Sequence, residues 1–200
     1  MANATADYGF TPVKAYSGEL RQIRCAVAAG YGTALFVGDP VSLDGSGFNG
    51  RPTVRVAPDD TSTVMIFGVI VGFEATGPDS LTTLHSLAST ADTVIVQPTL
   101  PGVVFRVNTS GATGASQNDI GLRFDHVATA GTALTGRSNY ALDMGDDATA
   151  GSATSNGWLL IGFDDRPDNE YSTTLATDTI NIDLLVTCVE SSWANGNGVA

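Results

Sequence analysis

Residues 179–190, TINIDLLVTCVE, decide the fold class of this chain. Every second position from Ile180 to Cys188 holds an aliphatic side chain or the cysteine, and a more polar set of side chains stands between them. This period of two is the pattern of a β-strand that buries one face. We expect that face to lie in the core, where a charge introduced at Leu184 would unfold the protein.

Further strands are predicted upstream, by alternation or by continuous apolar runs. The segments are residues 21–27, 34–37, 41–43, 51–57, 64–73, 93–97, 103–108 and 157–163. Glycine, proline, asparagine and serine separate them, and the glycines within 64–73 would allow a bend or bulge. Exposed helix formers are scarce, with one lysine and four glutamates in the chain. We predict an all-β fold, an antiparallel β-barrel or β-sandwich with long polar loops. A short helix over 81–87 is the one competing element, because leucines recur there every third position.

The chain divides by composition into an arm, a domain and a tail. Residues 1–17 show little periodicity and are predicted to form an extended N-terminal arm. Residues 18–193 would form a single all-β domain, and the Gly- and Asn-rich residues 194–200 a flexible tail. The arm could add a strand to a sheet of another subunit. Its candidate binding residues are Tyr8, Phe10, Thr11, Pro12 and Val13. The alternative is that this segment is the first strand, or a frayed terminus, of the domain itself.

Charge and the ends of the chain restrict the partners. The net charge is −12, which repels phosphate, so we expect no nucleic-acid partner. The first residues have neither a basic start nor an apolar run of signal-peptide length, and no stretch approaches about 20 apolar residues, so we expect no membrane partner and synthesis in the cytoplasm. Cys25 and Cys188 could form one disulfide, but both occupy alternating apolar positions that favour buried thiols.

Motifs of catalysis or metal binding are not recognised in the sequence. His85 and His126 are the two histidines, and they do not belong to a helical His pair, a nucleophile elbow or a phosphate-binding loop. We therefore predict no enzyme activity and no cofactor. Aspartates at 146–147 and 164–168 could supply oxygen ligands to calcium, but neither segment matches a calcium loop, and Arg166 provides a counter-charge. A solvated turn is the favoured interpretation of 164–168, and no metal site is predicted.

Three phrases resemble the capsid decoration proteins, or cement proteins, of tailed bacteriophages. They are ALFVGDPVSL (34–43), TGRSNYALD (135–143) and the run from WLLIGF (158–163) through DDRPDNEY to the closing strand. The resemblance implies a structural protein of the virion that binds the outer surface of the head and bridges major capsid protein subunits, with a homotrimer favoured. It also makes the predicted arm, with its five candidate binding residues, a capsid-binding segment, and the host cytoplasm the place of synthesis. Five polar residues become candidates for interface or turn positions: Arg137, Arg166, Asp168, Asn169 and Glu170.

A second hypothesis is a glycan-binding or host-contact β module of a virion, such as a head fibre or tail component. Sugar sites usually present an aromatic face for stacking. Trp158 begins an apolar strand and is expected in the core, so Trp193 is the better stacking candidate.

Overall fold

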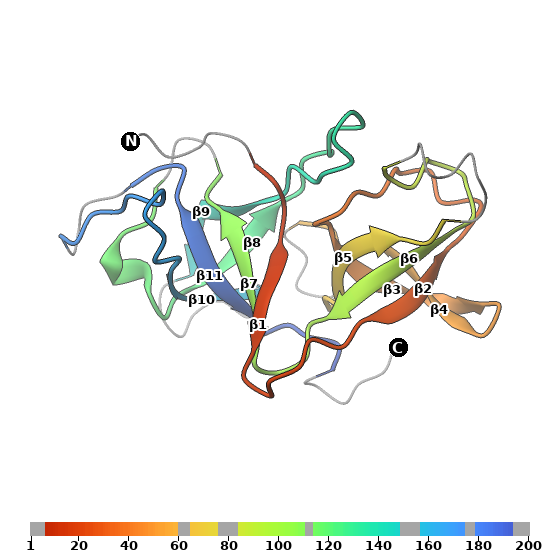
Figure 1. Ribbon diagram of the computed structural model, residues 1–200, viewed down its shortest axis with the longest axis horizontal. Helices are drawn as coiled ribbons and strands as arrows, with labels where there is room; N and C mark the ends of the chain where they lie inside the picture. The colour runs from red at the N-terminus through yellow and green to blue at the C-terminus, as the bar shows by residue number, and fades with distance from the viewer. Residues whose placement is uncertain are drawn as a thin grey trace.

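The computed structural model describes residues 7–59, 65–75, 84–110, 114–148, 157–174 and 179–193, and these residues form an all-β protein (Figure 1). The predicted fold class is confirmed. The strands are β1 (Thr11–Ala15), β2 (Ile23–Val27), β3 (Pro40–Phe48), β4 (Arg51–Val56), β5 (Gly68–Phe73), β6 (Asp92–Pro98), β7 (Val103–Asn108), β8 (Arg123–Val127), β9 (Ala141–Ala148), β10 (Trp158–Phe163) and β11 (Asp183–Cys188). A single 3₁₀ turn, Gln117–Asp119, lies among the described residues. Of the predicted helix, residues 81–83 lie outside the described part, and Ser86 forms an extended bridge with Leu35.

Five strands form a closed barrel in the order β2-β4-β3-β5-β6. All neighbours are antiparallel except β2 and β4, which pair in parallel at Ala26 and Thr53. The barrel core contains the inward side chains that alternation predicted, including Cys25, Val54 and Val96. The register of β5 shifts between Ile70 and Gly72, so the expected bulge is present at a glycine.

The other six strands form an antiparallel sheet in the order β1-β7-β11-β10-β8-β9. Its core is built around Trp158, whose indole stacks on Phe10 with ring centroids 4.2 Å apart. On the closing strand Leu184 and Val186 are fully buried as predicted. Ile180 is 47% exposed, because β11 begins only at Asp183, so its predicted burial is wrong.

The N-terminal segment is part of this sheet. Thr11–Ala15 pairs with β7, and Phe10 is fully buried in the core, so the predicted arm is wrong here and the first-strand alternative is correct. β1 is an edge strand, but Pro12 cannot donate a hydrogen bond and the register shifts between Pro12 and Lys14. A proline, a bulge and a lysine are features that block the pairing of another strand with a sheet edge.

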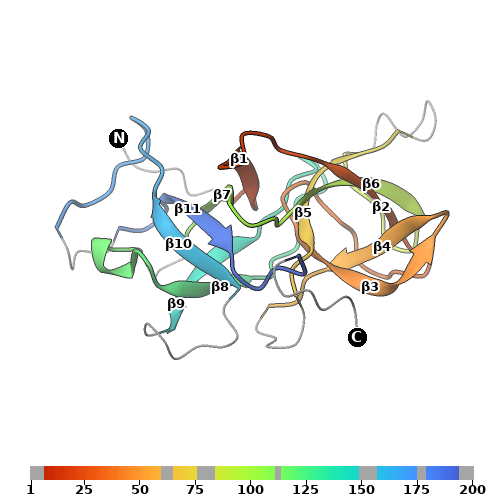
Figure 2. The ribbon, with the colours of Figure 1, turned by 90° about the horizontal axis from the view of Figure 1, so that it is seen from below.

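Along the sequence, the five barrel strands lie between β1 and β7, which are neighbours in the sheet. In space the two halves lie side by side, with β1 near their boundary (Figure 2). The chain leaves after β1 and returns before β7, where the Tyr16 N–H donates to the Gly102 carbonyl at 2.9 Å. A second junction lies at Gly38, whose carbonyl accepts from the Phe10 N–H at 2.9 Å. Gly38 has φ of +102°, and a Cβ there would lie 2.8 Å from the Tyr8 carbonyl, so a side chain is excluded.

The third junction joins residues 190–193, the last that the structure describes, to the barrel; the predicted tail, 194–200, lies outside the described residues. The Ile66 N–H donates to the Glu190 carbonyl at 2.9 Å, and the Ser191 hydroxyl donates to the Thr99 carbonyl. Trp193 stacks on Phe67 and donates from Nε1 to the Phe67 carbonyl at 2.9 Å. The two halves are therefore joined by hydrogen bonds at both ends of their boundary.

The cysteines lie in different cores. Cys25 is fully buried in the barrel, and Cys188 is half-buried against the core of the sheet. Both are free thiols, as the alternation predicted.

Candidate binding site

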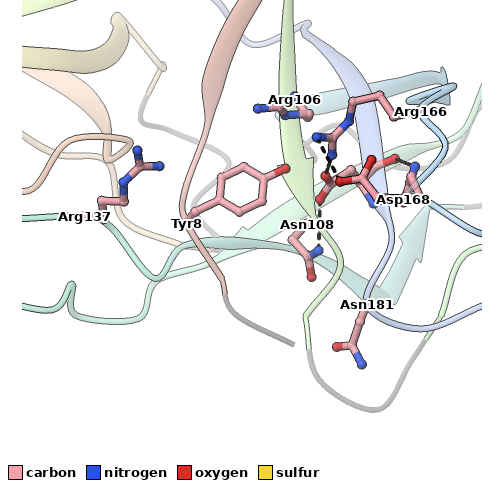
Figure 3. Close-up of a pocket in the computed structure, with 9 residues that line it drawn as sticks. Tyr8, Arg106, Asn108, Arg137, Arg166, Asp168 and Asn181 are labelled. Carbon is pink, nitrogen blue, oxygen red and sulfur yellow. Dashed lines mark hydrogen bonds and ion pairs between the residues drawn. The ribbon is translucent and has the colours of Figure 1, made fainter. Parts of the chain in front are cut away.

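A polar cavity of about 210 Å³ lies at one end of the six-stranded sheet (Figure 3). Five segments form its wall: Tyr8, which precedes β1, strand β7, the β8–β9 loop, the turn after β10, and the start of β11. The lining residues are Tyr8, Arg106, Asn108, Arg137, Arg166, Asp168, Asn169, Asn181 and Asp183.

Residues that the sequence singled out in three separate places meet at this cavity. Tyr8, from the predicted arm, lies beside Arg137 of the TGRS phrase and Arg166 of the DDRPDNEY phrase. Asp168 and Asn169 also line it. The other candidates are elsewhere: Phe10 is in the core, Thr11, Pro12 and Val13 belong to β1, and Glu170 is an exposed residue outside the lining.

Arg166 is the centre of an ion-pair network in the wall. Its guanidinium contacts Asp164 at 2.7 Å and Asp168 at 3.7 Å, and it donates to Asp183 on β11. Burial alone would lower the pKa of Arg166, but these carboxylates outweigh it and the pKa is raised. Arg106 on β7 contacts Asp164 at 3.4 Å, so the turn after β10 is tied to two strands.

Asn169 fixes the turn itself. Its Nδ2 donates to the carbonyls of Asp164 at 2.7 Å and Asp183 at 2.9 Å, and its Oδ1 accepts from the Asp183 N–H at 2.8 Å. The side chain thus bonds to the backbone of β11 as a neighbouring strand would. The favoured interpretation of 164–168 as a turn is correct for the described residues.

The wall also contains polar atoms without a protein partner. Asn108 is 2% exposed, and its Nδ2 donates to Asp183 at 3.1 Å while its Oδ1 bonds to no other atom. The Tyr8 hydroxyl is buried and has no hydrogen bond of ordinary geometry. Burial, and then the nearby Asp183 carboxylate, raise the pKa of Tyr8 well above its ordinary value. Such atoms are costly to bury and mark a wall that can accept further hydrogen bonds.

Arg137 differs from the other two arginines. Its side chain is exposed, and none of the ion pairs among the described residues includes it. In Figure 3 it lies on the opposite side of the Tyr8 ring from Arg106 and Arg166. The Arg106 guanidinium stands 5.7 Å from the centroid of that ring. Arg137 is therefore the cation of the cavity that is available to a partner.

Four lining residues were not predicted: Arg106, Asn108, Asn181 and Asp183. The sequence does contain a signal for Asp183 as a site residue, because it is a carboxylate within the most regular apolar strand. Asn181 has φ of +54°, a left-handed conformation that asparagine tolerates, but this is visible only in the structure.

The two histidines do not line the cavity. His126 is buried in the sheet core, where Trp158 Nε1 lies 3.4 Å from its Nδ1 and the Ala57 carbonyl 3.3 Å from its Nε2. The His85 ring stacks on Phe36 with centroids 4.9 Å apart. Both act as packing residues.

Comparison with family models, with curated proteins and with solved structures found no match for this chain. Within the described ranges, no helix is long and apolar enough to cross a bilayer. In the same residues, no group of three or more His, Cys, Asp or Glu side chains could hold a metal ion.

Proposed function

We propose that this protein is a capsid decoration protein, which binds the outer surface of a tailed-phage head and bridges major capsid protein subunits. The supporting observation is the convergence at one cavity of TGRS (135–138) and DDRPDNE (164–170), two of the phrases that carry the resemblance. If these two phrases were only local turns, they would not need to lie at the same cavity. If they form one binding surface, they must lie together.

The proposed action is binding without chemistry. The Arg166 ion pairs and the Asn169 bonds hold the cavity wall in one conformation, which favours docking of a complementary surface with little loss of entropy. The net charge of −12 would keep the protein away from packaged DNA. A homotrimer, the favoured assembly, would let modest contacts act together through effective concentration.

The decisive experiment mixes the purified protein with expanded capsids that lack it. We expect saturable co-sedimentation and a higher temperature of capsid disruption. Arg137→Ala should weaken binding several-fold, because it removes an exposed cation at the cavity. Arg55→Ala is the matched control, since that arginine lies on the barrel and contacts Asp44. No binding by the wild type would refute the proposal.

A glycan-binding module remains the second candidate, and the cavity is the feature that favours it. Amides, carboxylates and guanidinium groups together suit a hydroxyl-rich ligand, which both donates and accepts hydrogen bonds. Trp193 is a weaker sugar platform than expected, because Phe67 stacks on it. A glycan array with wild type, Asn108→Ala and Trp193→Ala separates the two candidates, since a decoration protein should ignore sugars.

A further inference from the structure

The connection between β8 and β9 carries an unusually exposed leucine. Residues 128–139, ATAGTALTGRSN, include the teal loop that projects from the top of the molecule in Figure 1. Leu134 is 87% exposed, more than any other large hydrophobic side chain in the described residues. A single exposed leucine is ordinary. Leu134 is of interest for binding because hydrogen bonds hold the loop that carries it in one shape.

The loop is held in shape by its own hydrogen bonds. The Thr132 N–H donates to the Arg137 carbonyl at 2.8 Å, and the Gly136 N–H returns to the Thr132 carbonyl at 2.9 Å. Asn139 Nδ2 donates to the Ala130 carbonyl at 2.8 Å and lies 3.2 Å from the Thr132 hydroxyl. A loop ordered in this way has little conformational freedom to lose when it binds.

The base of the loop is fixed to the barrel. The Val37 N–H donates to the Gly136 carbonyl at 3.0 Å, and the Ser138 N–H donates to the Val37 carbonyl at 2.9 Å. Gly136 has φ of +67°, and a Cβ there would overlap the backbone of Leu84. Glycine at 136 therefore permits both the conformation and the close approach. These contacts hold residues 136–138 of the loop against the barrel half.

The chemistry of the loop selects its partner. Leu84, which is 51% exposed, lies against Gly136, so a second leucine adjoins the base of the loop. Arg137 is the only charged residue in 128–139, although the chain as a whole has a net charge of −12. The loop itself therefore contributes no carboxylate to a docking surface. The complementary surface is an apolar pocket bordered by carboxylates or carbonyl oxygens.

We propose that the 128–139 loop is the preformed docking element of this protein, and that Leu134 inserts into an apolar pocket on a major capsid protein subunit while Arg137 pairs with acceptors at the rim. This inference rests on the proposed function. Burying one leucine side chain corresponds to roughly a ten- to hundredfold gain in affinity.

The test compares Leu134→Ser with Ile120→Ser in binding to expanded capsids. Ile120 is 41% exposed and follows the 3₁₀ turn, away from the loop, so it controls for the loss of any exposed apolar side chain. Because Leu134 is nearly fully exposed, its replacement should leave the melting temperature unchanged. We expect Leu134→Ser to bind at least tenfold more weakly, and Ile120→Ser to bind as the wild type does.

Three other outcomes would overturn the inference. Equal binding by Leu134→Ser and wild type would refute the docking role of the loop and leave the decoration function standing. A change of oligomeric state in Leu134→Ser, measured by sedimentation, would assign the loop to contacts between copies of this chain. Failure of the wild type to bind capsids would remove both proposals.

Discussion

At the scale of single residues, Asp39 is the most unusual group in the described chain. It is 1% exposed at the junction of barrel and sheet, where its Oδ2 accepts from the Phe36 N–H at 2.8 Å and its Oδ1 has no partner. Burial raises the pKa of Asp39 to about 6, although hydrogen bonds from Ser138 and Phe36 partly oppose this. The junction therefore contains a carboxyl group that binds a proton more tightly than an exposed aspartate does.

This preference predicts how stability depends on pH. Asp39 has a pKa of 3.8 in the unfolded chain and about 6 in the folded protein, so the folded state binds the proton more tightly. Its contribution to the free energy of unfolding should be greatest below pH 4, and should fall by up to about 3 kcal/mol as the pH rises through 6 to about 7. Urea titrations from pH 4 to 8 on wild type and Asp39→Asn would measure this as a difference in the free energy of unfolding that declines until about pH 7 and is then constant.

Asp44→Asn is the control for the pH experiment, because Asp44 forms a partly exposed pair with Arg55. Its difference from wild type should change much less over the same range, since exposed pairs contribute little. The free energy of unfolding could instead differ between wild type and Asp39→Asn by the same amount from pH 4 to 8. That result would show that Asp39 is ionised in the folded state without cost.

At the scale of elements, β1 shows where periodicity fails. Strands such as β2, β6 and β11 alternate clearly and were predicted from sequence, with boundaries displaced by a few residues. β1 is short and bulged, and the residue that anchors it, Phe10, lies just outside it. No local pattern distinguishes such a segment from a free arm. The pairing with β7 is a long-range contact that the sequence does not display.

The anchoring of β1 by Phe10 can be tested by substitution. Phe10→Ala should lower the free energy of unfolding by about 3–5 kcal/mol, because it leaves a cavity against Trp158. Val13→Ala, on the same segment but 39% exposed, should cost much less. Chemical denaturation followed by fluorescence gives both values. If a protein lacking residues 1–16 folds with unchanged stability, the segment is an arm after all.

The candidate site was also predictable only in part, because the pairing of distant strands is not visible in the sequence. TGRS and DDRPDNE stand out locally as turn-rich phrases, and Arg137, Arg166, Asp168 and Asn169 were identified from them. Their partners were missed, because Asn108 and Asp183 meet them only through the pairing of β7 with β11. Strand order is a non-local property, and it decides which turns share a surface.

In the molecule as a unit, two hydrophobic cores meet at one boundary, where Val69 of β5 belongs to the core of the sheet and Val56 of β4 packs against both cores. The barrel and the sheet are joined by the hydrogen bond from Phe10 to Gly38 and by the bridge between Ile66 and Ser191, and the bond from Tyr16 to Gly102 ties together the two connections that lead into and out of the barrel. Backbone hydrogen bonds at each place couple the halves more tightly than a flexible linker would. Unfolding of one half would break bonds of the other.

We therefore predict a single cooperative unfolding transition. In Trp193→Phe, the remaining Trp158 reports the sheet core, and pulsed labelling of Cys25 reports the barrel core. Burial raises the pKa of Cys25 to about 12, so its thiol should react slowly until the barrel opens. The urea midpoints of the two probes should coincide, with peptide mapping used to separate Cys25 from Cys188. Distinct midpoints would divide the predicted single domain into two.

The insertion of the barrel between β1 and β7 has an evolutionary consequence. Its entry and exit lie one hydrogen bond apart, at Tyr16 and Gly102, and the strands they extend are neighbours in the sheet. A shorter ancestor could have joined these strands by a simple hairpin and acquired the barrel in one genetic event without changing the strand order. Relatives of this chain could then differ by the exchange of an entire barrel while the sheet that carries the polar cavity is retained.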